Sequence, residues 1–312
     1  MIPATARFIW FGDKLPFLYM VALRSAAVNG GFQSVVLHGE EGVQSSPFWD
    51  YLEATPGFRF EGITPNVFLD CGLDCGEELH QLFSALEAPA AKANMVRAAL
   101  LYREGGVYLD TDTVTVGSFQ PLLAPGGFFC GNERICFPGG AEAPAGLASW
   151  ARSVGLLAAR DAVRRLPRGW KLFRRLESSY HLAANNAVMG SEAGHTFVKE
   201  LLQSMVRMDK SRQFVRFALG THLLQQCLER TGDPSVRVYP PEVFFPLSPE
   251  ISQHWFRNDP NAAVGEMLRP ETRVVHWYAS VRTKAIVPTL TPSEIERRAV
   301  SVPLYRMIQS LL

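Results

Sequence analysis

Residues 105–116 read Gly105-Gly106-Val107-Tyr108-Leu109-Asp110-Thr111-Asp112-Thr113-Val114-Thr115-Val116, and this stretch decides the fold. From Val107 onward it alternates and is rich in β-branched residues, so at least part of it is predicted to be a strand. The residues before it, from Pro89 to Arg103, are good helix formers with proline near the start and a glycine pair just after the end. This pattern predicts a helix that leads directly into the strand.

The N-terminal part of the chain predicts a second unit of alternating elements. Residues 6–12 are rich in aromatic and β-branched residues and stop at a glycine, which is typical of a buried strand and its turn. A helical pattern runs from Phe17 to about Val28, and residues 34–39 read as another strand. Strand, helix and strand in this order form a parallel crossover unit, so we predict an α/β fold. Residues 40–76 are interrupted by prolines and should hold loops, a short helix and at most one strand.

The remaining pattern predicts helices over 194–207 and 221–230 and a last strand over 273–278. Residues 150–177 carry eight Lys or Arg and two acids, a local charge of +6, which leaves −5 for the rest of the chain. We find no internal repeat and no low-complexity linker. The simplest organisation is one domain over 1–312 with a basic helical insertion at about 141–180.

Composition excludes several classes of protein. The chain has 312 residues and a formal net charge of +1, which gives no reason to expect a nucleic-acid partner. No apolar run approaches the roughly 18 to 20 residues that span a bilayer, and the N-terminus lacks a signal-peptide pattern. Five scattered cysteines do not form the even framework of a small secreted domain and favour a reducing compartment. These features predict a cytoplasmic protein.

The two aspartates of the deciding stretch call for a chemical explanation. At positions i and i+2 of a strand, Asp110 and Asp112 would project to the same face and repel one another unless a cation or protons intervene. Carboxylate oxygens suit Mg²⁺ or Mn²⁺, and these ions keep positions open for water or substrate phosphates. The alternative is a strand end whose acids are solvated or paired with arginine.

The surroundings of these aspartates resemble a known family. Residues 93–97 (Ala93-Asn94-Met95-Val96-Arg97), Leu101-Tyr102 and the strand Tyr108-Leu109-Asp110-Thr111-Asp112 are similar in order to the sugar-transferase family defined by its Asp-x-Asp motif. That family groups fungal initiating mannosyltransferases, animal lactosylceramide galactosyltransferases and, more remotely, clostridial glucosylating toxins. The resemblance extends outward to four further segments, which are Ile9-Trp10-Phe11-Gly12, Asn186-Ala187-Val188-Met189-Gly190, Tyr239-Pro240-Pro241 and His276-Trp277.

The resemblance implies a metal-dependent glycosyltransferase with a Rossmann-like mixed sheet of the GT-A type, flanked by helices. It implies a nucleotide-sugar donor, with UDP favoured over GDP, retention of anomeric configuration, Mn²⁺ or Mg²⁺ as cofactor, and an acceptor of unknown class. A cation and a nearby arginine would stabilise the charge that builds on the departing nucleoside diphosphate.

Carried over residue by residue, the resemblance also assigns roles. Asp112 would be the more direct metal ligand, and Asp110 would contact ribose, sugar or metal. Asn94 and Arg97 would reach the hydroxyls and phosphate of the donor, and Asn186 would lie near the transferred sugar. The remaining expected donor contacts are Trp10 stacked on the nucleobase, Tyr108 lining the pocket, and His276, Trp277 and Ser280 closing over the diphosphate, with His276 able to touch the metal.

Plain structural alternatives exist for several of these residues. Trp10 and Tyr108 could be ordinary core aromatics, and Arg97 could pair with Glu104. Asn185 competes with Asn186 for the family's asparagine. The chain departs from the family at two places: Asn94 stands where an acid is usual, and Val281 follows Ser280 where a tryptophan is common.

Two other functions fit part of the pattern. Asp110 to Val114 also fits the motif of haloacid-dehalogenase-like phosphatases, with Asp110 as nucleophile, although that motif normally opens its fold and here follows about 105 residues. A non-catalytic module that binds nucleotide sugars or glycans is the other alternative. The basic stretch 150–177, with its interleaved apolar residues, could contact an anionic membrane or an acidic acceptor, or simply form a solvated helical face.

Overall fold

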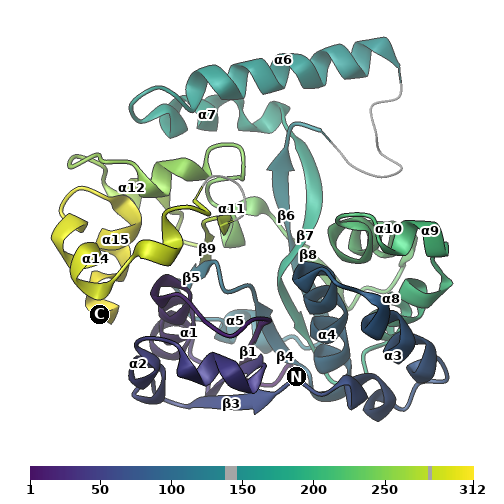
Figure 1. Ribbon diagram of the computed structural model, residues 1–312. Helices are drawn as coiled ribbons and strands as arrows, with labels where there is room; N and C mark the ends of the chain where they lie inside the picture. Colours follow the sequence, from purple (N-terminus) through teal and green to yellow (C-terminus); the bar gives the residue numbers. More distant parts are fainter. Residues whose placement is uncertain (138–145, 280–282) are drawn as a thin grey trace.

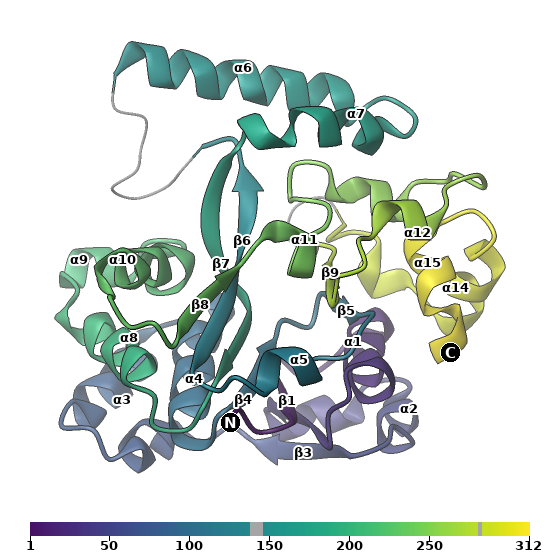
Figure 2. The same cartoon turned by 180° about the vertical axis from the view of Figure 1, so that it is seen from behind.

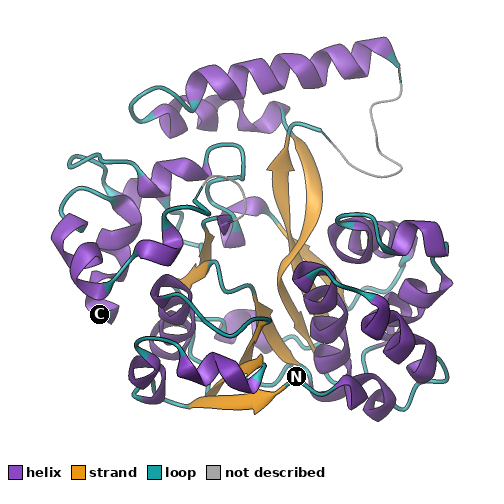
Figure 3. Ribbon diagram, viewed as in Figure 1, coloured by secondary structure: helices purple, strands orange, loops and turns teal. Residues whose placement is uncertain are grey.

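A mixed sheet of seven strands forms the centre of the computed structural model, which describes residues 1–137, 146–279 and 283–312 (Figure 1). The strand order is β3-β2-β1-β4-β7-β6-β8, and helices flank the sheet (Figure 3). The predicted α/β fold with a mixed sheet is confirmed. The strands are β1 (Thr5–Trp10), β2 (Ser34–Gly39), β3 (Phe58–Gly62), β4 (Gly106–Leu109), β6 (Phe128–Ile135), β7 (His181–Ser191) and β8 (Val236–Tyr239).

The directions of these strands divide the sheet into two parts. Strands β1, β2, β3 and β4 are parallel, with β1 paired to β2 on one side and to β4 on the other. Strand β7 runs antiparallel to β4 and β6, and β8 runs parallel to β6. After β1 the chain first adds β2 and β3 on one side of that strand and later adds β4 on its other side. In open α/β sheets, ligands bind beyond the carboxyl ends of the strands at the point where the order reverses in this way.

Both faces of the sheet are buried, and successive residues contribute to opposite cores. Phe8, Val107 and Val188 belong to the core beneath α1 and the C-terminal helices, whereas their neighbours Ile9, Tyr108 and Met189 belong to the core beneath α3, α4, α8 and α10. The period of two follows from strand geometry. The helices of eight or more residues are α1 (Phe17–Asn29), α3 (Gly76–Ala85), α4 (Pro89–Glu104), α6 (Leu147–Val163), α7 (Gly169–Leu176), α8 (Thr196–Arg207) and α10 (Leu223–Arg230).

Shorter helices complete the chain and gather mainly toward its C-terminus (Figure 2). The predicted helices near 17–28, 89–103, 194–207 and 221–230 are confirmed to within a few residues, as is the single strand between residues 40 and 76. No helix of the described residues is long and apolar enough to cross a membrane. The short helices are α2 (Trp49–Glu53), α5 (Gln120–Leu123), α9 (Lys210–Gln213), α11 (Pro241–Phe244), α12 (Val264–Met267), α14 (Pro292–Arg298) and α15 (Pro303–Ile308).

A glycine pair sets the junction between α4 and β4. Gly105 and Gly106 have φ of +66° and +101°, a region that other residues rarely adopt. A Cβ on Gly106 would lie 2.7 Å from the carbonyl oxygen of Thr5, and one on Gly105 would lie 2.8 Å from that of Ser191. Because no side chain fits, the pair places the end of α4 directly against the start of β4, and so fixes the helix relative to the strand.

Asp110 and Asp112 lie between two sheets, not on one strand as expected. β4 ends at Leu109, and β5 (Thr113–Thr115) pairs with β9 (Val274–His276) in a separate two-stranded sheet. The Asp110 N–H still donates to the carbonyl of Ala187 (2.8 Å), but the Thr113 hydroxyl then donates to the Asp110 carbonyl (2.7 Å) and closes a turn. This turn ends the strand and directs the chain toward the C-terminal segment.

The basic insertion lies beyond the end of the sheet. Strands β6 and β7 continue as a long ribbon, and α6 and α7 lie across the far end of it (Figures 1 and 2). Two helices thus occupy the predicted insertion at about 141–180, of which residues 141–145 lie outside the described part of the chain. We did not predict β6 or β7, and they contribute side chains to the site described next.

Candidate active site

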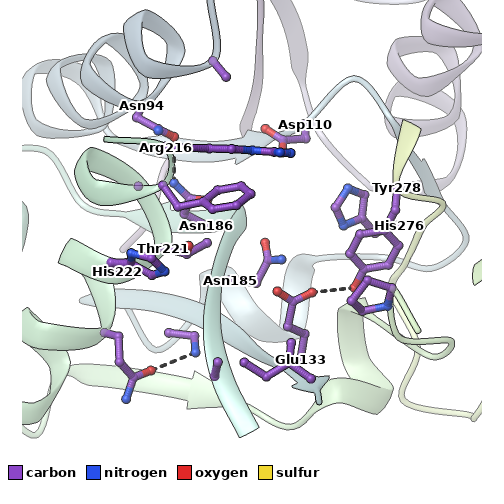
Figure 4. A pocket seen from close by; sticks show the side chains of 18 of the residues that line it. Asn94, Asp110, Glu133, Asn185, Asn186, Arg216, Thr221, His222, His276 and Tyr278 are labelled. Carbon is purple, nitrogen blue, oxygen red and sulfur yellow. Dashed lines mark hydrogen bonds between the residues drawn. The ribbon is translucent and has the colours of Figure 1, made fainter. Parts of the chain in front are cut away.

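A cavity of about 440 Å³ opens beside the ends of β4 and β7 (Figure 4). Its walls come from α4, the turn after β4, the β6–β7 ribbon, the segment before α10 and the residues around β9. Six of the expected site residues line it, although they are spread over more than 180 positions of the sequence. They are Asn94, Arg97, Asp110, Asp112, Asn186 and His276.

Asp110 is held by two groups from the core. One guanidinium nitrogen of Arg97 lies 3.2 Å from its Oδ1, and the hydroxyl of Tyr108 donates to the same oxygen at 2.6 Å. The guanidinium of Arg97 also lies over the ring of Tyr108, 4.2 Å from its centre. The alternative pairing of Arg97 with Glu104 is wrong, because Glu104 pairs with Arg7 and Arg103 on the other side of the helix end.

Asp112 and His276 form a second buried pair. His276 Nε2 lies 3.0 Å from Asp112 Oδ1, and the Ala279 N–H donates to Asp112 Oδ2 at 2.7 Å. Burial alone would raise the pKa of Asp112, but the imidazole and these hydrogen bonds outweigh it and lower the pKa. Burial would likewise lower the pKa of His276, but Asp112 outweighs it and raises the pKa. Both shifts therefore favour the charged form of the side chain concerned.

These three side chains form a group that could hold a cation. One ligand atom from each of Asp110, Asp112 and His276 falls within 4.8 Å of the others. Nδ1 of His276 is buried and has no hydrogen-bond partner among the described residues. Two carboxylates and an imidazole are suitable ligands for Mn²⁺, and the carboxylates also for Mg²⁺.

A pair of amides forms the wall beside α4. The Asn186 Nδ2 donates to the Asn94 Oδ1 at 2.9 Å, and Arg97 donates to the carbonyl of Asn186. Gly220 lies against both amides, since a Cβ on it would be 2.7 Å from Asn94 Nδ2 and 3.1 Å from Asn186 Nδ2. Asn185 has a different role: its Oδ1 accepts from the Ala187 N–H at 2.7 Å, and its side chain also hydrogen-bonds Glu133.

The expected aromatic contacts lie outside the cavity. Trp10 packs on Tyr19 with ring centres 4.9 Å apart, and Tyr19 stacks on Trp277 at 5.5 Å. Trp277 is fully buried. Tyr108, also buried, reaches the site only through its hydroxyl on Asp110. None of Trp10, Tyr108 and Trp277 lines the cavity, and Ser280 and Val281 lie outside the described residues.

Sequence reasoning missed several residues that line the cavity. Glu133 and Tyr278 form its floor, where the Tyr278 hydroxyl donates to Glu133 Oε2 at 2.8 Å (Figure 4). Arg216 and Phe217 lie at its exposed side and precede a single π-helical turn over Ala218–His222. Tyr278 was inside the predicted last strand, but no motif marked any of these residues as part of a site.

One family model matches the chain over residues 63–128, and its description reads glycosyltransferase sugar-binding region containing DXD motif. The matched segment includes α4, β4 and both aspartates. Over these residues the chain is similar to the sugar-binding region of glycosyltransferases that carry a DXD motif. The expected relation to the Asp-x-Asp sugar transferases is confirmed, and the match favours it over the phosphatase alternative. Asn186 and His276 lie outside the matched segment.

Several solved glycosyltransferase structures are similar to this chain at low identity. The PaToxG glycosyltransferase is 14% identical, with 99% of this chain and 87% of that chain covered and a TM-score of 0.46. The galactosyltransferase LgtC is 12% identical, with coverages of 98% and 94% and a TM-score of 0.44. Mouse xyloside xylosyltransferase 1 is 12% identical, with coverages of 88% and 98% and a TM-score of 0.44. The search of curated proteins finds no match.

Proposed function

We propose that this glycosyltransferase moves a sugar from a nucleotide-sugar donor to an acceptor with the help of a divalent cation held by Asp110, Asp112 and His276. The observation that carries the proposal is the convergence of these three side chains in one cavity, from segments 164 residues apart. UDP-sugars as donors and retention of configuration are further parts of the proposal, supported by the family resemblance of the motif residues.

The side chains present fit a bound cation. Without one, Asp112 is hydrogen-bonded to His276, and Asp110 is paired with Arg97. A divalent cation would supply charge opposite the pyrophosphate and so stabilise the leaving nucleoside diphosphate. Mn²⁺ suits this mixed oxygen and nitrogen set well, and Mg²⁺ suits the two carboxylates.

The neighbouring groups of the protein have separate tasks in this proposal. Arg97 is fixed by Asp110 and Tyr108, so its charge is available to the donor phosphate without further ordering. The amides of Asn94 and Asn186 present donors and acceptors to sugar hydroxyls. Because this wall carries no charge, it binds the donor by hydrogen bonds alone.

The basic insertion offers a contact surface for an anionic membrane or an acidic acceptor. Arg165 and Arg175 make no ion pair within the described residues, and the neighbouring Leu166 and Leu172 are exposed. Most of the other basic groups contact the chain itself, which reduces the charge left for a partner. Co-sedimentation with vesicles of anionic and of neutral lipid would test the membrane contact. Equal binding to both would contradict it.

A panel of donors is the direct test of the proposed function. We expect the protein with Mn²⁺ to release nucleotide from at least one UDP- or GDP-sugar, and we expect Asp112→Asn to lower that rate by about 10³-fold without loss of the folded state. Circular dichroism would confirm folding. Metal-dependent binding of a donor without any turnover would favour the non-catalytic module, and no binding of any donor would overturn the proposal.

A further inference from the structure

We propose that Glu133 is the base of an acceptor subsite, which binds a hydroxyl group and removes its proton as the sugar is transferred. This inference rests on the proposed function. It adds a residue and a chemical class of acceptor, an alcohol, that neither the matched segment nor the motif residues assign.

The position of Glu133 separates it from the donor-binding wall. Glu133 is paired with Ala183 of β7, which lies three residues before Asn186 in that strand. At about 3.3 Å per residue this offset is about 10 Å. Figure 4 shows Glu133 on the opposite side of the cavity from Asp110. A donor held at Asp110, Asp112 and the amide pair would therefore leave this end of the cavity for an acceptor.

The partners of Glu133 orient its carboxyl group toward the cavity. The Tyr278 hydroxyl donates to its Oε2 at 2.8 Å, and Asn185 adds a second hydrogen bond. Two donors aimed at one carboxyl group favour its ionised form and fix its direction. Tyr278 in turn packs on His276, with ring centres 3.9 Å apart, so the subsite is joined directly to the cation-binding residues.

The backbone at Tyr278 supports a functional role for this contact. Its φ is +55°, in the left-handed region that a bulky residue rarely adopts. Such strained conformations persist where the surrounding structure fixes them and cluster at active sites. The strained turn is what directs the phenol ring to Glu133 while β9 ends at His276.

Burial gives this carboxyl group the character of a base. Desolvation raises the pKa of Glu133, while Asn185, Tyr278 and the charge of His276 oppose the rise and Glu250 adds to it. A raised pKa makes a carboxylate a better proton acceptor.

The proposed step is balanced within the groups named. The acceptor O–H bond breaks and its proton passes to the carboxylate of Glu133, while the acceptor oxygen forms a bond to the anomeric carbon on the face from which the diphosphate leaves, so that the configuration is retained. The bond from that carbon to the phosphate oxygen breaks, and its electron pair leaves with the nucleoside diphosphate. Water in the acceptor position gives hydrolysis of the donor by the same step.

Donor hydrolysis tests the assignment without a known acceptor. The probe is UDP-glucose, or whichever sugar nucleotide of the panel the wild type hydrolyses fastest, with Mn²⁺ and no added acceptor. We expect Glu133→Gln and Glu133→Ala to lower nucleotide release about 10²-fold. Sodium formate should restore a large part of the rate to Glu133→Ala alone, because a small carboxylate can replace the missing base. Tyr278→Phe should give a smaller loss, and the exposed Glu271→Ala should match the wild type.

The outcomes separate the two proposals. Hydrolysis by Glu133→Ala within about threefold of the wild type would overturn the assignment, and so would a loss that formate does not rescue in a folded variant that still binds Mn²⁺ and the donor. Failure of the wild type to hydrolyse any donor would instead overturn the proposed function, and this assignment with it. Thermal melting and calorimetric Mn²⁺ titration of each variant distinguish a lost base from a lost fold.

Discussion

Acid–base pairs occur both in the candidate active-site cavity and in the basic insertion, but the pairs of the cavity are buried and some of those in the insertion are exposed. In the cavity Arg97 and His276 have side chains only 6% and 7% exposed, and each meets an aspartate. In the insertion Lys171 and Glu266 form a pair whose side chains are 50% and 56% exposed. Buried pairs leave an uncompensated charge when one partner is removed, whereas exposed pairs are screened by water and contribute little.

The two regions therefore differ in how firmly their charged side chains are held. Each of the two aspartates has two partners: Arg97 and Tyr108 hold Asp110, and His276 and the Ala279 N–H hold Asp112. In the insertion, three ion pairs join α6, α7 and the residues between them to the segment 250–266. They are Arg160 with Glu250, Arg168 with Asp259 and Lys171 with Glu266. Substitutions should therefore affect activity in the first region and stability, to a graded extent, in the second.

The largest effect is expected for Arg97→Ala. In the proposed function this change removes the charge that would face the donor phosphate. It also leaves Asp110 with only Tyr108, so nucleotide release should fall by about 10²- to 10³-fold. Steady-state kinetics with the best donor of the panel would measure it. Arg97→Lys retains the charge but loses the planar fork and should recover only part of the rate. If Arg97→Ala released nucleotide at nearly the rate of the wild type, the expectation that substitutions in the cavity mainly affect activity would be wrong.

The buried His254 gives the next effect, which depends on pH. His276 has an acid partner, but His254, beneath α7, has its Nε2 buried without a partner among the described residues. Burial and Arg257 lower the pKa of His254 from 6.5 to about 4. The unfolded chain therefore binds a proton below pH 6.5 that the folded chain binds only near pH 4, so stability is lost as the pH falls between these values.

The size of this effect follows from the same two pKa values. Between pH 7 and pH 5 His254 should contribute a loss of about 2 kcal/mol in the free energy of unfolding. Urea unfolding at both pH values would measure the loss, and His254→Gln should show a smaller one because glutamine does not titrate. Equal losses in the two proteins would show that His254 is not the responsible group.

A partly buried pair of the insertion should give an intermediate effect. Arg160 contacts Glu250, and the two side chains are 15% and 11% exposed. Arg160→Ala is expected to lower the free energy of unfolding by about 1.5 kcal/mol, the scale of one hydrogen bond between charged groups, with nucleotide release unchanged. Parallel urea unfolding and kinetic measurements would test both statements. A large loss of nucleotide release with an unchanged free energy of unfolding would mean that the insertion contributes to the reaction.

The smallest effect is expected at the exposed pair. Lys171→Ala removes the contact with Glu266 and should change the free energy of unfolding by less than about 0.5 kcal/mol. Urea unfolding at low and high salt would measure it. A change above 1 kcal/mol would mean that this pair is not screened as its exposure indicates.

The local parts of the fold could be predicted from the sequence, because their signals lie within a few residues. Pro89 and the glycine pair marked both ends of α4, β-branched and aromatic residues marked β1 and β2, and alternation marked β4. The long strands β6 and β7 were missed. β6 carries the polar run Asn132-Glu133-Arg134, and β7 carries Asn185-Asn186, so neither shows the apolar pattern of a buried strand.

Site residues that lie close together in the sequence could likewise be predicted, whereas those that meet through long-range packing could not. The spacing of Asp110 and Asp112 predicted a cation site on chemical grounds, and the resemblance added Asn94 and Arg97 from the preceding helix. His276 was anticipated only through the resemblance, since its place beside Asp112 depends on the pairing of β5 with β9 across 160 residues. Glu133 and Tyr278 meet through the same long-range packing, which no local pattern encodes.

The pairing of β5 with β9 also affects how the protein matures during synthesis. Asp112 receives its hydrogen bonds from His276 and Ala279, which the ribosome adds more than 160 residues later. A growing chain can form the parallel strands and α4 long before it has these partners. The nascent polypeptide thus carries Asp112 without these partners while more than half of the chain is made, and the three side chains of the proposed cation site come together only near the end of synthesis.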